Sequence, residues 1–336
     1  ATMASGSVGT GPFVLESHEV GVKSVSVKNE GFDWWGYSAG RTCPLDRIEY
    51  IDYGTDPAAW LAAAEADEVD CFYENVGEYV DIMEGIGWEN SEIATGSTIL
   101  IRPNQTSPDA DGNTVYADKR VRQASAMAVD NNICLELGYA NKGQAADNHH
   151  AGPMHPEHDA SVGRLPFDPA KAKALMAEAG MADYEHELIS IDDDWRKNTT
   201  DAVAAQLRDA GIKVKRTILP GSTFWNDWAK YPFSSTNWNH RPFATQVWGL
   251  AYRSGEAWNE MGWSNAEFDA LLAEANAIAD ADKRRAVAGK CQALIAEEGC
   301  TIQPYWRSLY RSHSSNTVCD MHIAYHAHVY KWGFKA

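Results

Sequence analysis

The sequence of 336 residues lacks the features that mark several large classes of protein. It contains no run of about 18 or more apolar residues, which is the length that a helix needs to cross a bilayer. It is poor in basic residues, because 29 Lys and Arg stand against 47 Asp and Glu, for a net charge of −18. Nucleic acids and anionic membrane surfaces are bound through basic patches, so this balance argues against both as partners.

The sequence also lacks the local motifs of common enzymes. It has no GxSxG nucleophile elbow, and none of its cysteines lies in a catalytic signature. The glycine-rich segment at residues 6–11, GSVGTG, has neither the Lys-Ser/Thr of a P-loop nor the GxGxxG order of a dinucleotide-binding turn. We therefore expect a protein without enzymatic activity and without a cofactor.

Cysteine gives no framework for a zinc site, since the sequence contains no CxxC pair. An even number of cysteines is compatible with disulfides, and Cys300 and Cys319 are a candidate pair across adjacent strands. Buried free thiols are an equally open alternative. The six cysteines are Cys43, Cys71, Cys134, Cys291, Cys300 and Cys319.

Histidine comes closest to a metal-binding pattern. Residues 148–158, NHHAGPMHPEH, contain four imidazoles, and neutral histidine suits Zn, Ni and Cu. The spacing is not that of a helical i, i+4 pair, and two prolines indicate an extended loop, so we favour a structural loop and assign no metal ligand. The alternative function is a metal-binding protein or metallohydrolase that uses His149, His150, His155 and Glu157. A second group of histidines lies on an expected strand, and for it too we assign no metal ligand: His322, His326 and His328.

The apolar periodicity predicts an α/β protein. Residues 11–28 alternate as a hairpin with Gly21 at the turn, and further strands are expected over 45–52 and 96–102, together forming one mixed sheet with flanking helices. Asp56 is suited to cap a helix that extends through about residue 66, and a further helix is expected to begin near Asp118. After a loop over residues 103–117, helices are expected at 168–179, 195–210, 222–230, 264–279 and 282–298, and strands at 186–191, 212–218, 245–251, 301–313 and 319–330.

Residues 234–260 combine large aromatic side chains with fixed charges, which suits a pocket that clamps a small polar ligand. In this interpretation aromatic rings supply apolar walls, arginines anchor negative charge, and the polar side chains add directional hydrogen bonds. The alternative is ordinary core with structural ion pairs. The predicted ligand-binding residues are Trp238, Asn239, His240, Arg241, Tyr252, Arg253, Glu256, Trp258 and Asn259.

Four segments, in this order, resemble the extracytoplasmic solute-binding proteins of ABC transporters, in the peptide and nickel type called family 5. They are GTGPFVLESHEVG at residues 9–21, the helix with VRQASAMAVDNN within residues 116–143, FDPAKAKALMAEAG at 167–180, and the paired helices and strand at 264–306. The resemblance extends from residue 9 to about residue 332. It implies a two-lobed periplasmic-binding-protein-like fold, with mixed sheets flanked by helices and a hinge between the lobes.

The resemblance also implies a function: capture of a peptide-like or carboxylate-bearing solute by lobe closure, in the periplasm or another extracytoplasmic space, and delivery to an ABC permease in the membrane. Residues 1–117 would be the remainder of lobe I, 118–308 lobe II, and 309–336 the return to lobe I. The family's GTGPF segment lies well inside the mature protein, so we expect the fold to be incomplete at its N-terminus, with a missing N-terminal segment as a further partner. A chain with no activity of its own, acting only in a larger assembly, is a third possibility.

In peptide-binding members, an aspartate that follows a Trp-Gly strand pairs with the α-amino group of the ligand. Here Ala251 stands at that position after Trp248 and Gly249. Burying an unpaired ammonium group is costly, whereas Arg241 and Arg253 suit a carboxylate. We therefore expect a carboxylate-bearing ligand rather than a standard peptide held by its free amino group.

Overall fold

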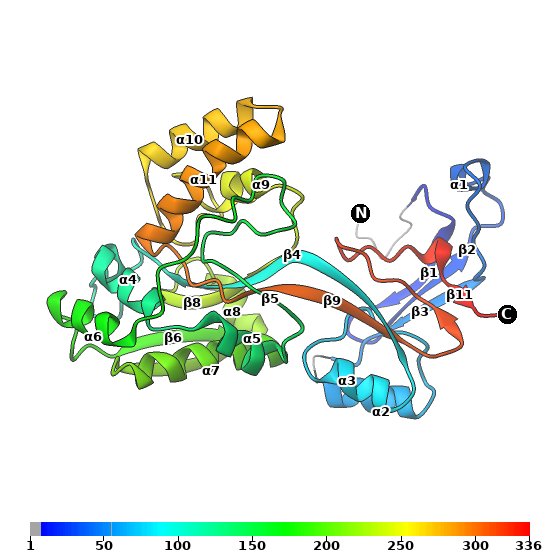
Figure 1. Cartoon of the computed structure of the whole chain (residues 1–336). Coiled ribbons are helices and arrows are strands. Elements are labelled where there is room, and N and C mark those ends of the chain that lie inside the picture. The colour runs from blue at the N-terminus through cyan, green and yellow to red at the C-terminus, as the bar shows by residue number, and fades with distance from the viewer. Residues whose placement is uncertain (1–7, 55) are drawn as a thin grey trace. The chain divides into compact units, whose positions relative to one another are not determined.

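The computed structural model describes residues 8–54 and 56–336, and these divide into two compact units (Figure 1). Unit 1 runs through Ile93 and resumes at Leu309–Ala336, whereas unit 2 is the continuous segment Ala94–Ser308. Thr55 and the beginning of the glycine-rich segment at residues 6–11 lie outside the described residues.

The chain passes from unit 1 into unit 2 after Ile93, which is earlier in the sequence than the boundary expected near residue 117. The expected boundary loop belongs to unit 2, because Val115 and Tyr116 at its end are buried in that unit's core. The chain returns to unit 1 at Leu309, and the assignment of residues to the two lobes stays a prediction.

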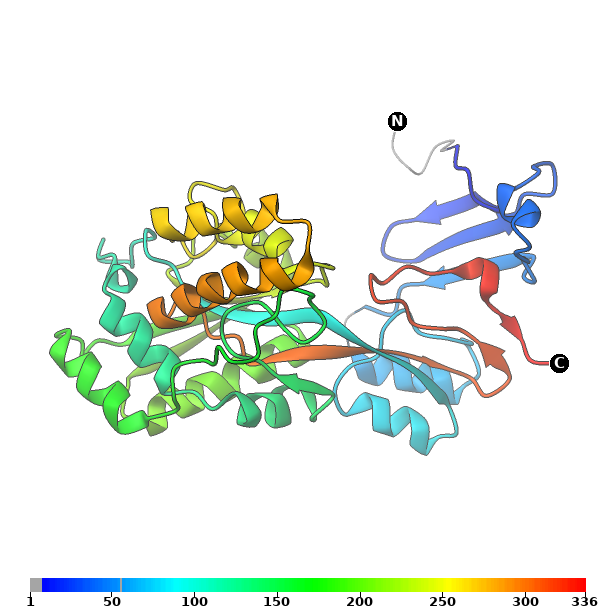
Figure 2. The same ribbon diagram turned by 45° about the horizontal axis from the view of Figure 1, so that its top comes forward.

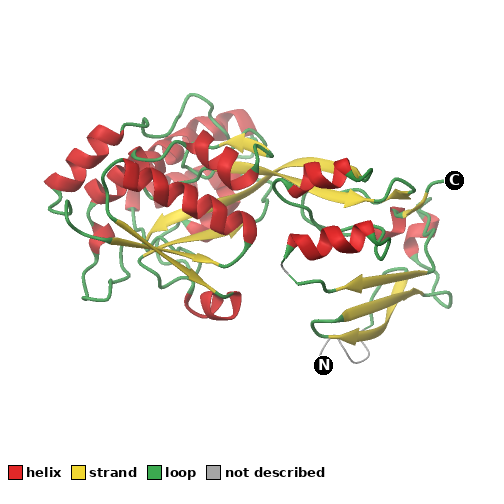
Figure 3. Ribbon diagram, turned by 90° about the horizontal axis from the view of Figure 1, so that it is seen from below, coloured by secondary structure: helices red, strands yellow, loops and turns green. Residues whose placement is uncertain are grey.

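Unit 1 contains a three-stranded antiparallel sheet in the order β1-β2-β3 (Figure 3). Its first two strands form the predicted hairpin, with Gly21 at a positive φ of 73° in the turn. A small apolar core forms elsewhere in the unit around Phe72, Met83 and Trp88. The elements of unit 1 are β1 (Phe13–Glu19), β2 (Lys23–Lys28), α1 (Trp35–Ser38), β3 (Arg47–Ile51), α2 (Pro57–Glu65), α3 (Tyr79–Gly85), β10 (Thr317–Val318), the 3-10 helix η2 (Val329–Lys331) and β11 (Gly333–Phe334).

Unit 2 is built on a six-stranded mixed sheet in the order β5-β9-β4-β8-β6-β7. β6 runs parallel to both β7 and β8, whereas β4 pairs with β8 and β5 with β9 in antiparallel register. The strands are β4 (Glu89–Pro103), β5 (Gly143–Ala145), β6 (His186–Ile191), β7 (Val214–Leu219), β8 (Phe233–Trp238) and β9 (Tyr305–His313). The single mixed sheet expected for residues 11–102 is therefore wrong, because β4 joins this second sheet and leaves β1–β3 as a separate one.

Helices cover both faces of the six-stranded sheet, as the alternation of elements predicted (Figures 1 and 2). One face carries α5 and α7, and the other carries α9, α10 and α11. No helix of the described chain combines the length and the apolar character that a membrane crossing requires. The helices are η1 (Val115–Ala117), α4 (Lys119–Met127), α5 (Asn131–Tyr139), α6 (Pro169–Glu178), α7 (Asp194–Asp209), α8 (Gly221–Asp227), α9 (Ala244–Ala251), α10 (Ala266–Ala277) and α11 (Ala281–Glu298).

Two expected strands are wrong. Residues 245–251 form helix α9, whose buried positions Ala244, Val247, Trp248 and Ala251 follow helical spacing. The expected strand over 319–330 is instead a loop that ends in η2.

Both β4 and β9 carry the chain from one unit into the other, since the divisions at Ile93 and Ser308 fall inside these strands. They are neighbours in the sheet of unit 2. There the hydroxyl of Thr95 donates a hydrogen bond of 2.8 Å to the carbonyl oxygen of Arg307. The two ends of unit 2 therefore lie side by side.

Candidate functional site

Residues 234–260, the predicted ligand-binding segment, begin in β8 and end at Glu260, which forms a buried ion pair with Arg102. Glu260 is almost completely buried, and its Oε2 lies 3.3 Å from Nε of Arg102, which is also buried. The other carboxylate oxygen of Glu260 accepts hydrogen bonds from the indole of Trp238 at 2.9 Å and from the hydroxyl of Thr236 at 2.7 Å. The carboxylate of Glu260, 22 residues later in the chain, thus fixes the orientation of the Trp238 ring.

The loop that follows β8 is fixed against the beginning of the unit 2 segment of β4. The backbone N–H of Gly96 donates to Nδ1 of His240 at 2.9 Å, and the N–H of His240 donates to the hydroxyl of Ser97 at 3.0 Å. A Cβ at position 96 would lie 3.0 Å from His240 and 3.1 Å from Nε2 of His155. Glycine at this position allows the close approach, so the backbone of β4 sets the position of His240.

The two predicted arginine anchors differ in their partners. Arg253 forms an ion pair with Glu256, and its Nε donates to Oε1 at 2.7 Å. Arg241 donates to the carbonyl oxygens of Asn239 and His240, at 3.3 and 3.1 Å, and among the described residues no carboxylate pairs with it. Arg241 is therefore the predicted anchor whose charge is not neutralised by the protein.

The remaining predicted residues divide between the core and the surface. Tyr252 is fully buried, and its hydroxyl hydrogen-bonds with Nδ1 of His150 at 3.1 Å. The amide of Asn259 donates to backbone carbonyls, including that of Trp263 at 2.7 Å. Trp258, in contrast, is 47% exposed and stands edge-on to Trp238 at a centroid distance of 5.8 Å. Of the nine predicted residues, Asn239, Arg253 and Trp258 are exposed, and Arg241 is half-buried.

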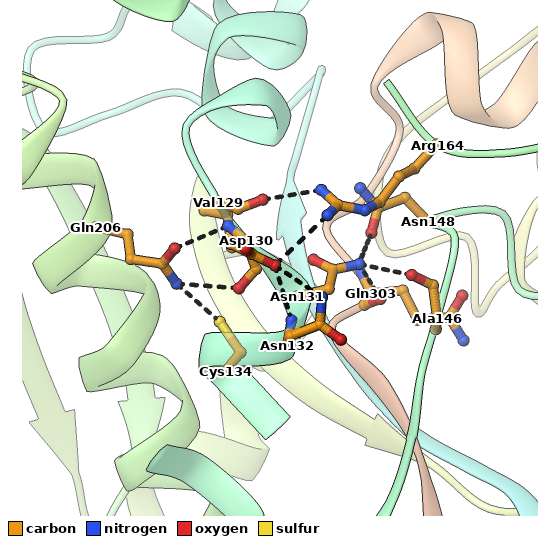
Figure 4. A network of polar contacts seen from close by, with 10 residues as sticks. All are labelled: Val129, Asp130, Asn131, Asn132, Cys134, Ala146, Asn148, Arg164, Gln206 and Gln303. Carbon is orange, nitrogen blue, oxygen red and sulfur yellow. Dashed lines mark hydrogen bonds and ion pairs between the residues drawn. The ribbon is translucent and has the colours of Figure 1, made fainter. Parts of the chain in front are cut away.

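A buried polar network holds the histidine-rich loop in unit 2 (Figure 4). The amide of Asn131 donates to the carbonyl oxygens of Ala146 and Gln303 and to Oδ1 of Asn148, at 2.7, 3.1 and 3.0 Å. Gln303 in turn accepts a hydrogen bond of 2.8 Å from the N–H of His150. Asn148 and His150 both have positive φ, at 61° and 55°, a conformation that these hydrogen bonds stabilise.

The histidines of this loop have separate protein partners. In His149, Nε2 hydrogen-bonds with the carbonyl oxygen of Val162 at 3.1 Å, and Nδ1 accepts from the N–H of Ala151 at 3.3 Å. His155 uses its two nitrogens in the same way, with Gly152 and Arg241. Burial lowers the pKa of His149 and of His155 to about 4. Both imidazoles are therefore neutral at pH 7.

Glu157, offered above as a metal ligand, has a structural role. Its carboxylate is buried 3.1 Å from Nε of Arg284 and accepts hydrogen bonds from the N–H of Ala244 at 3.3 Å and the hydroxyl of Thr245 at 3.4 Å. It therefore satisfies the N-terminus of α9, where Phe243 provides no side-chain cap. His149, His150, His155 and Glu157 do not converge on one point in the described structure, although His149 lies near Asp147 and His158.

Sequence reasoning missed two features of this region. The buried Arg102–Glu260 pair joins residues far apart in the chain, and no local pattern signals it. A shallow, open groove also lies on the outer surface of α9 and contains none of the predicted site residues. It is lined by Pro242, Phe243, Thr245, Gln246, Gly249, Leu250 and Asn276.

The candidate pair of Cys300 and Cys319 is not supported by the described structure. Cys300 belongs to the core of unit 2, whereas Cys319 lies in unit 1 next to Cys71. A hydrogen bond with Cys319, together with burial, raises the pKa of the Cys71 thiol well above its usual value. All six cysteines are free.

Solved structures with the same fold include the substrate-binding domain of an oligopeptide ABC transporter from Bacillus anthracis. The oligopeptide-binding protein AppA from Bacillus subtilis, in complex with a nonapeptide, superposes with a TM-score of 0.81 at 20% identity, over 97% of this chain and 66% of that one. NikA from Staphylococcus aureus, in complex with Ni(L-His)₂, gives a TM-score of 0.81 at 16% identity, over 97% of this chain and 69% of that one. The predicted periplasmic-binding-protein-like α/β fold is confirmed.

The family follows from the sequence. Residues 2–259 match the profile of the bacterial extracellular solute-binding proteins, family 5 Middle, and the chain belongs to this family. Heme-binding protein A of Haemophilus influenzae is 26% identical over 324 residues, covering 88% of this chain and 53% of that protein. Oligopeptide-binding protein AppA of Bacillus subtilis is 25% identical over 332 residues, covering 89% of this chain and 55% of that protein. The chain thus spans about half the length of these curated relatives.

Proposed function

We propose that the protein is the extracytoplasmic substrate-binding component of an ABC importer, which captures a peptide-like or carboxylate-bearing solute and delivers it to a membrane permease. Membership of family 5 of the extracellular solute-binding proteins is the observation that carries this proposal. The function is capture without chemistry, by the two-lobed closing movement that the family resemblance implies. We assign unit 1 to lobe I and unit 2 to lobe II.

The curated relatives support a ligand that carries a carboxylate. Their names describe binding of heme, of oligopeptides and, in Di/tripeptide-binding protein 3 of Pseudomonas aeruginosa, of short peptides. Heme has propionate groups and a peptide has a C-terminal carboxylate, so one anionic group is common to these otherwise different ligands. An arginine without a carboxylate partner is a suitable receptor for such a group.

Among the nine predicted site residues, we assign the anchoring role to Arg241. Glu256 already neutralises Arg253, which makes Arg253 the weaker receptor. The half-exposed ring of Trp258, which packs against Trp238, offers an apolar wall. We assign Tyr252 and Asn259 a supporting role without direct ligand contact, because their polar groups are already hydrogen-bonded to protein partners.

Two measurements test this function. First, protein purified without refolding is denatured, and the released small molecules are identified; a stoichiometric acidic solute or peptide is expected. Second, the chain is titrated calorimetrically with a pool of synthetic tripeptides that have free C-termini, and with the same pool after C-terminal amidation. Only the free acids should bind tightly, and equal binding of the amidated pool contradicts the role of the carboxylate.

Substitution of the anchor sharpens the second measurement. Arg241→Gln should weaken binding of the free-acid peptides about 10- to 100-fold, because a hydrogen-bonded charge pair contributes roughly 1.5–3 kcal/mol. Arg241→Lys keeps the charge but loses the bidentate geometry and should give an intermediate loss. Arg253→Gln is the matched control, with a change of no more than about fivefold. A larger loss with Arg253→Gln than with Arg241→Gln would move the anchor to Arg253.

A further inference from the structure

Three histidines in the loop before η2 bring their rings together in unit 1. One ring nitrogen of each of His322, His326 and His328 lies within 4.8 Å of the others. The rings of His322 and His326 stack at a centroid distance of 4.9 Å, and the ring of His328 lies 4.4 Å from that of His322. Residues separated by up to six positions in the sequence thus form one compact group of nitrogen donors.

Tyr325 holds this loop in a bent conformation. Its φ is 60°, and its N–H donates a hydrogen bond of 2.8 Å to the carbonyl oxygen of His322, which closes a turn between two of the histidines. The hydroxyl of Tyr73 donates to the carbonyl oxygen of Tyr325 at 3.0 Å, and the hydroxyl of Tyr325 donates to Glu74 at 3.3 Å. The convergence of the rings is therefore built on a turn that is anchored to a different segment of unit 1.

The imidazole nitrogens of this group are mostly available. Among the described residues, the rings of His326 and His328 form no hydrogen bond, and His326 is exposed. His322 uses Nδ1 to accept a hydrogen bond of 3.2 Å from the N–H of Ala324. Coordination by His322 would replace that single hydrogen bond.

A second group of possible metal ligands in the described structure differs in the availability of its ring nitrogens. Asp147, His149 and His158 also have ligand atoms within 4.8 Å of one another. Both nitrogens of His149, however, already bind the backbone, at Val162 and Ala151. Coordination at His149 would leave buried backbone groups without partners, which is costly.

Charges of both signs lie around the histidine loop of unit 1. Lys331 lies near His322 and His328, Arg311 lies near His322, and both oppose the binding of a cation. Asp320 offsets part of this positive charge, with one carboxylate oxygen 3.8 Å from Nζ of Lys331. The other carboxylate oxygen, Oδ1, is buried and has no hydrogen-bond partner among the described residues. A carboxylate in this position favours a nearby cation.

We propose that His322, His326 and His328 bind one divalent transition-metal ion of the kind that prefers imidazole, namely Zn²⁺, Ni²⁺ or Cu²⁺. Zinc–nitrogen bonds of about 2.0–2.1 Å place tetrahedral ligand nitrogens about 3.4 Å apart, so the rings need to approach only slightly. Three protein ligands leave one coordination position for water or an outside ligand. This proposal does not depend on the proposed function, because it concerns a loop without any of the residues assigned to solute binding.

The test uses the whole chain, without an affinity tag and stripped by a chelator, titrated with Zn²⁺ and analysed for bound metal. The wild-type protein should bind one Zn²⁺ per chain, and His326→Ala/His328→Ala should bind it at least about 100-fold more weakly, since changes to groups that only support metal ligands already cost 10- to 100-fold. His158→Ala is the matched control and should bind like the wild type. Peptide binding should be unchanged in all three proteins.

The proposal is overturned if the wild type binds no stoichiometric Zn²⁺, if the double variant binds it equally well, or if only His158→Ala loses it. X-ray absorption on zinc-loaded wild type provides a test that needs no variant. It should find three imidazole nitrogens at about 2.0–2.1 Å. A first shell made only of oxygen would contradict the assignment.

Discussion

Residues 147–158 of unit 2 and residues 322–328 of unit 1 each gather several histidines, but protein groups occupy the ring nitrogens far more completely in the first segment. There His149 and His155 each use both nitrogens in hydrogen bonds, and the loop backbone is tied to Asn131. In the second segment a single ring nitrogen, on His322, is hydrogen-bonded within the part of the chain that the structure describes. The two segments thus differ in the availability of nitrogen lone pairs rather than in the presence of histidine, and our metal-site proposal rests on that availability.

Among residues 147–158, removal of the buried carboxylate of Glu157 should have the largest effect on the free energy of unfolding. Glu157→Ala removes the partner of Arg284 and the cap of α9 at once, and should lower the free energy of unfolding by about 3–5 kcal/mol. Chemical denaturation at pH 7.5 measures this loss. Glu136→Ala, at an exposed position of α5, is the control and should change stability by no more than about 0.5 kcal/mol. Equal effects of the two substitutions would remove the structural role assigned to Glu157.

Acid should destabilise the first segment through its neutral histidines. The folded-state pKa of His149 and of His155 is about 4, below the ordinary value of 6.5, so the unfolded chain takes up protons first as pH falls. Stability should decrease between pH 6.5 and 4 by up to about 1.4 kcal/mol per pH unit for each histidine, with no further contribution below pH 4. The charged and titratable neighbours that modulate these two histidines are Asp147, His158 and His240.

Urea denaturation across this pH range, on the wild type and on His155→Gln, isolates the histidine contribution from that of the carboxylates. The variant removes one of the two titrating groups, so its stability should depend less steeply on pH. Identical slopes for the two proteins would exclude His155 as a source of acid sensitivity.

A smaller loss is expected from the amide that ties the loop to the helix. Asn131→Ala removes a donor from three buried acceptors, of which Oδ1 of Asn148 keeps the N–H of Gln303, and should cost about 1–3 kcal/mol. Asn132→Ala, at the next position of α5, changes an exposed side chain and should cost less than about 0.5 kcal/mol. Thermal unfolding of the two variants side by side gives the comparison, and a reversed order would disprove it.

The smallest effect belongs to the second segment. In the absence of metal, His326→Ala/His328→Ala should change the free energy of unfolding by no more than about 0.5 kcal/mol, because these imidazoles make no hydrogen bond among the described residues. Denaturant unfolding in the presence of a chelator measures this. A loss comparable to that of Asn131→Ala would mean that the two histidine segments have the same structural role.

Much of the fold of unit 2 could be predicted from apolar periodicity. Strand β6 occupies the predicted residues 186–191, and α11 matches the expected 282–298 closely, because both depend on local patterns. Helix α9 was missed because its cap is supplied by Glu157, 87 residues earlier in the chain. A local pattern contains no information about such a partner.

Aromatic and charged composition predicts the candidate binding segment, which stays a prediction, but it does not give the contacts of each residue. Trp238 and Thr236 are oriented by Glu260, whose backbone also accepts a hydrogen bond from Arg102, 158 residues away in the sequence. Arg253 pairs with Glu256, which is one of the structural ion pairs that the alternative interpretation of this segment allowed. The absence of such a partner for Arg241 depends on the tertiary arrangement of all nearby carboxylates, which composition does not provide.

The side-by-side course of β4 and β9 has a consequence for the order in which the protein is made. Every residue of unit 2 has been synthesised once Ser308 leaves the ribosome, so that unit can fold while the chain is still growing. Unit 1 must wait, because the N–H of Phe72 pairs with the carbonyl oxygen of Ser312 and that of Asn75 pairs with Tyr310. The strands that precede unit 2 in this chain therefore belong to the unit that is completed after it, and a nascent chain stopped once residue 308 has left the exit tunnel should carry a folded unit 2 beside a protease-sensitive unit 1.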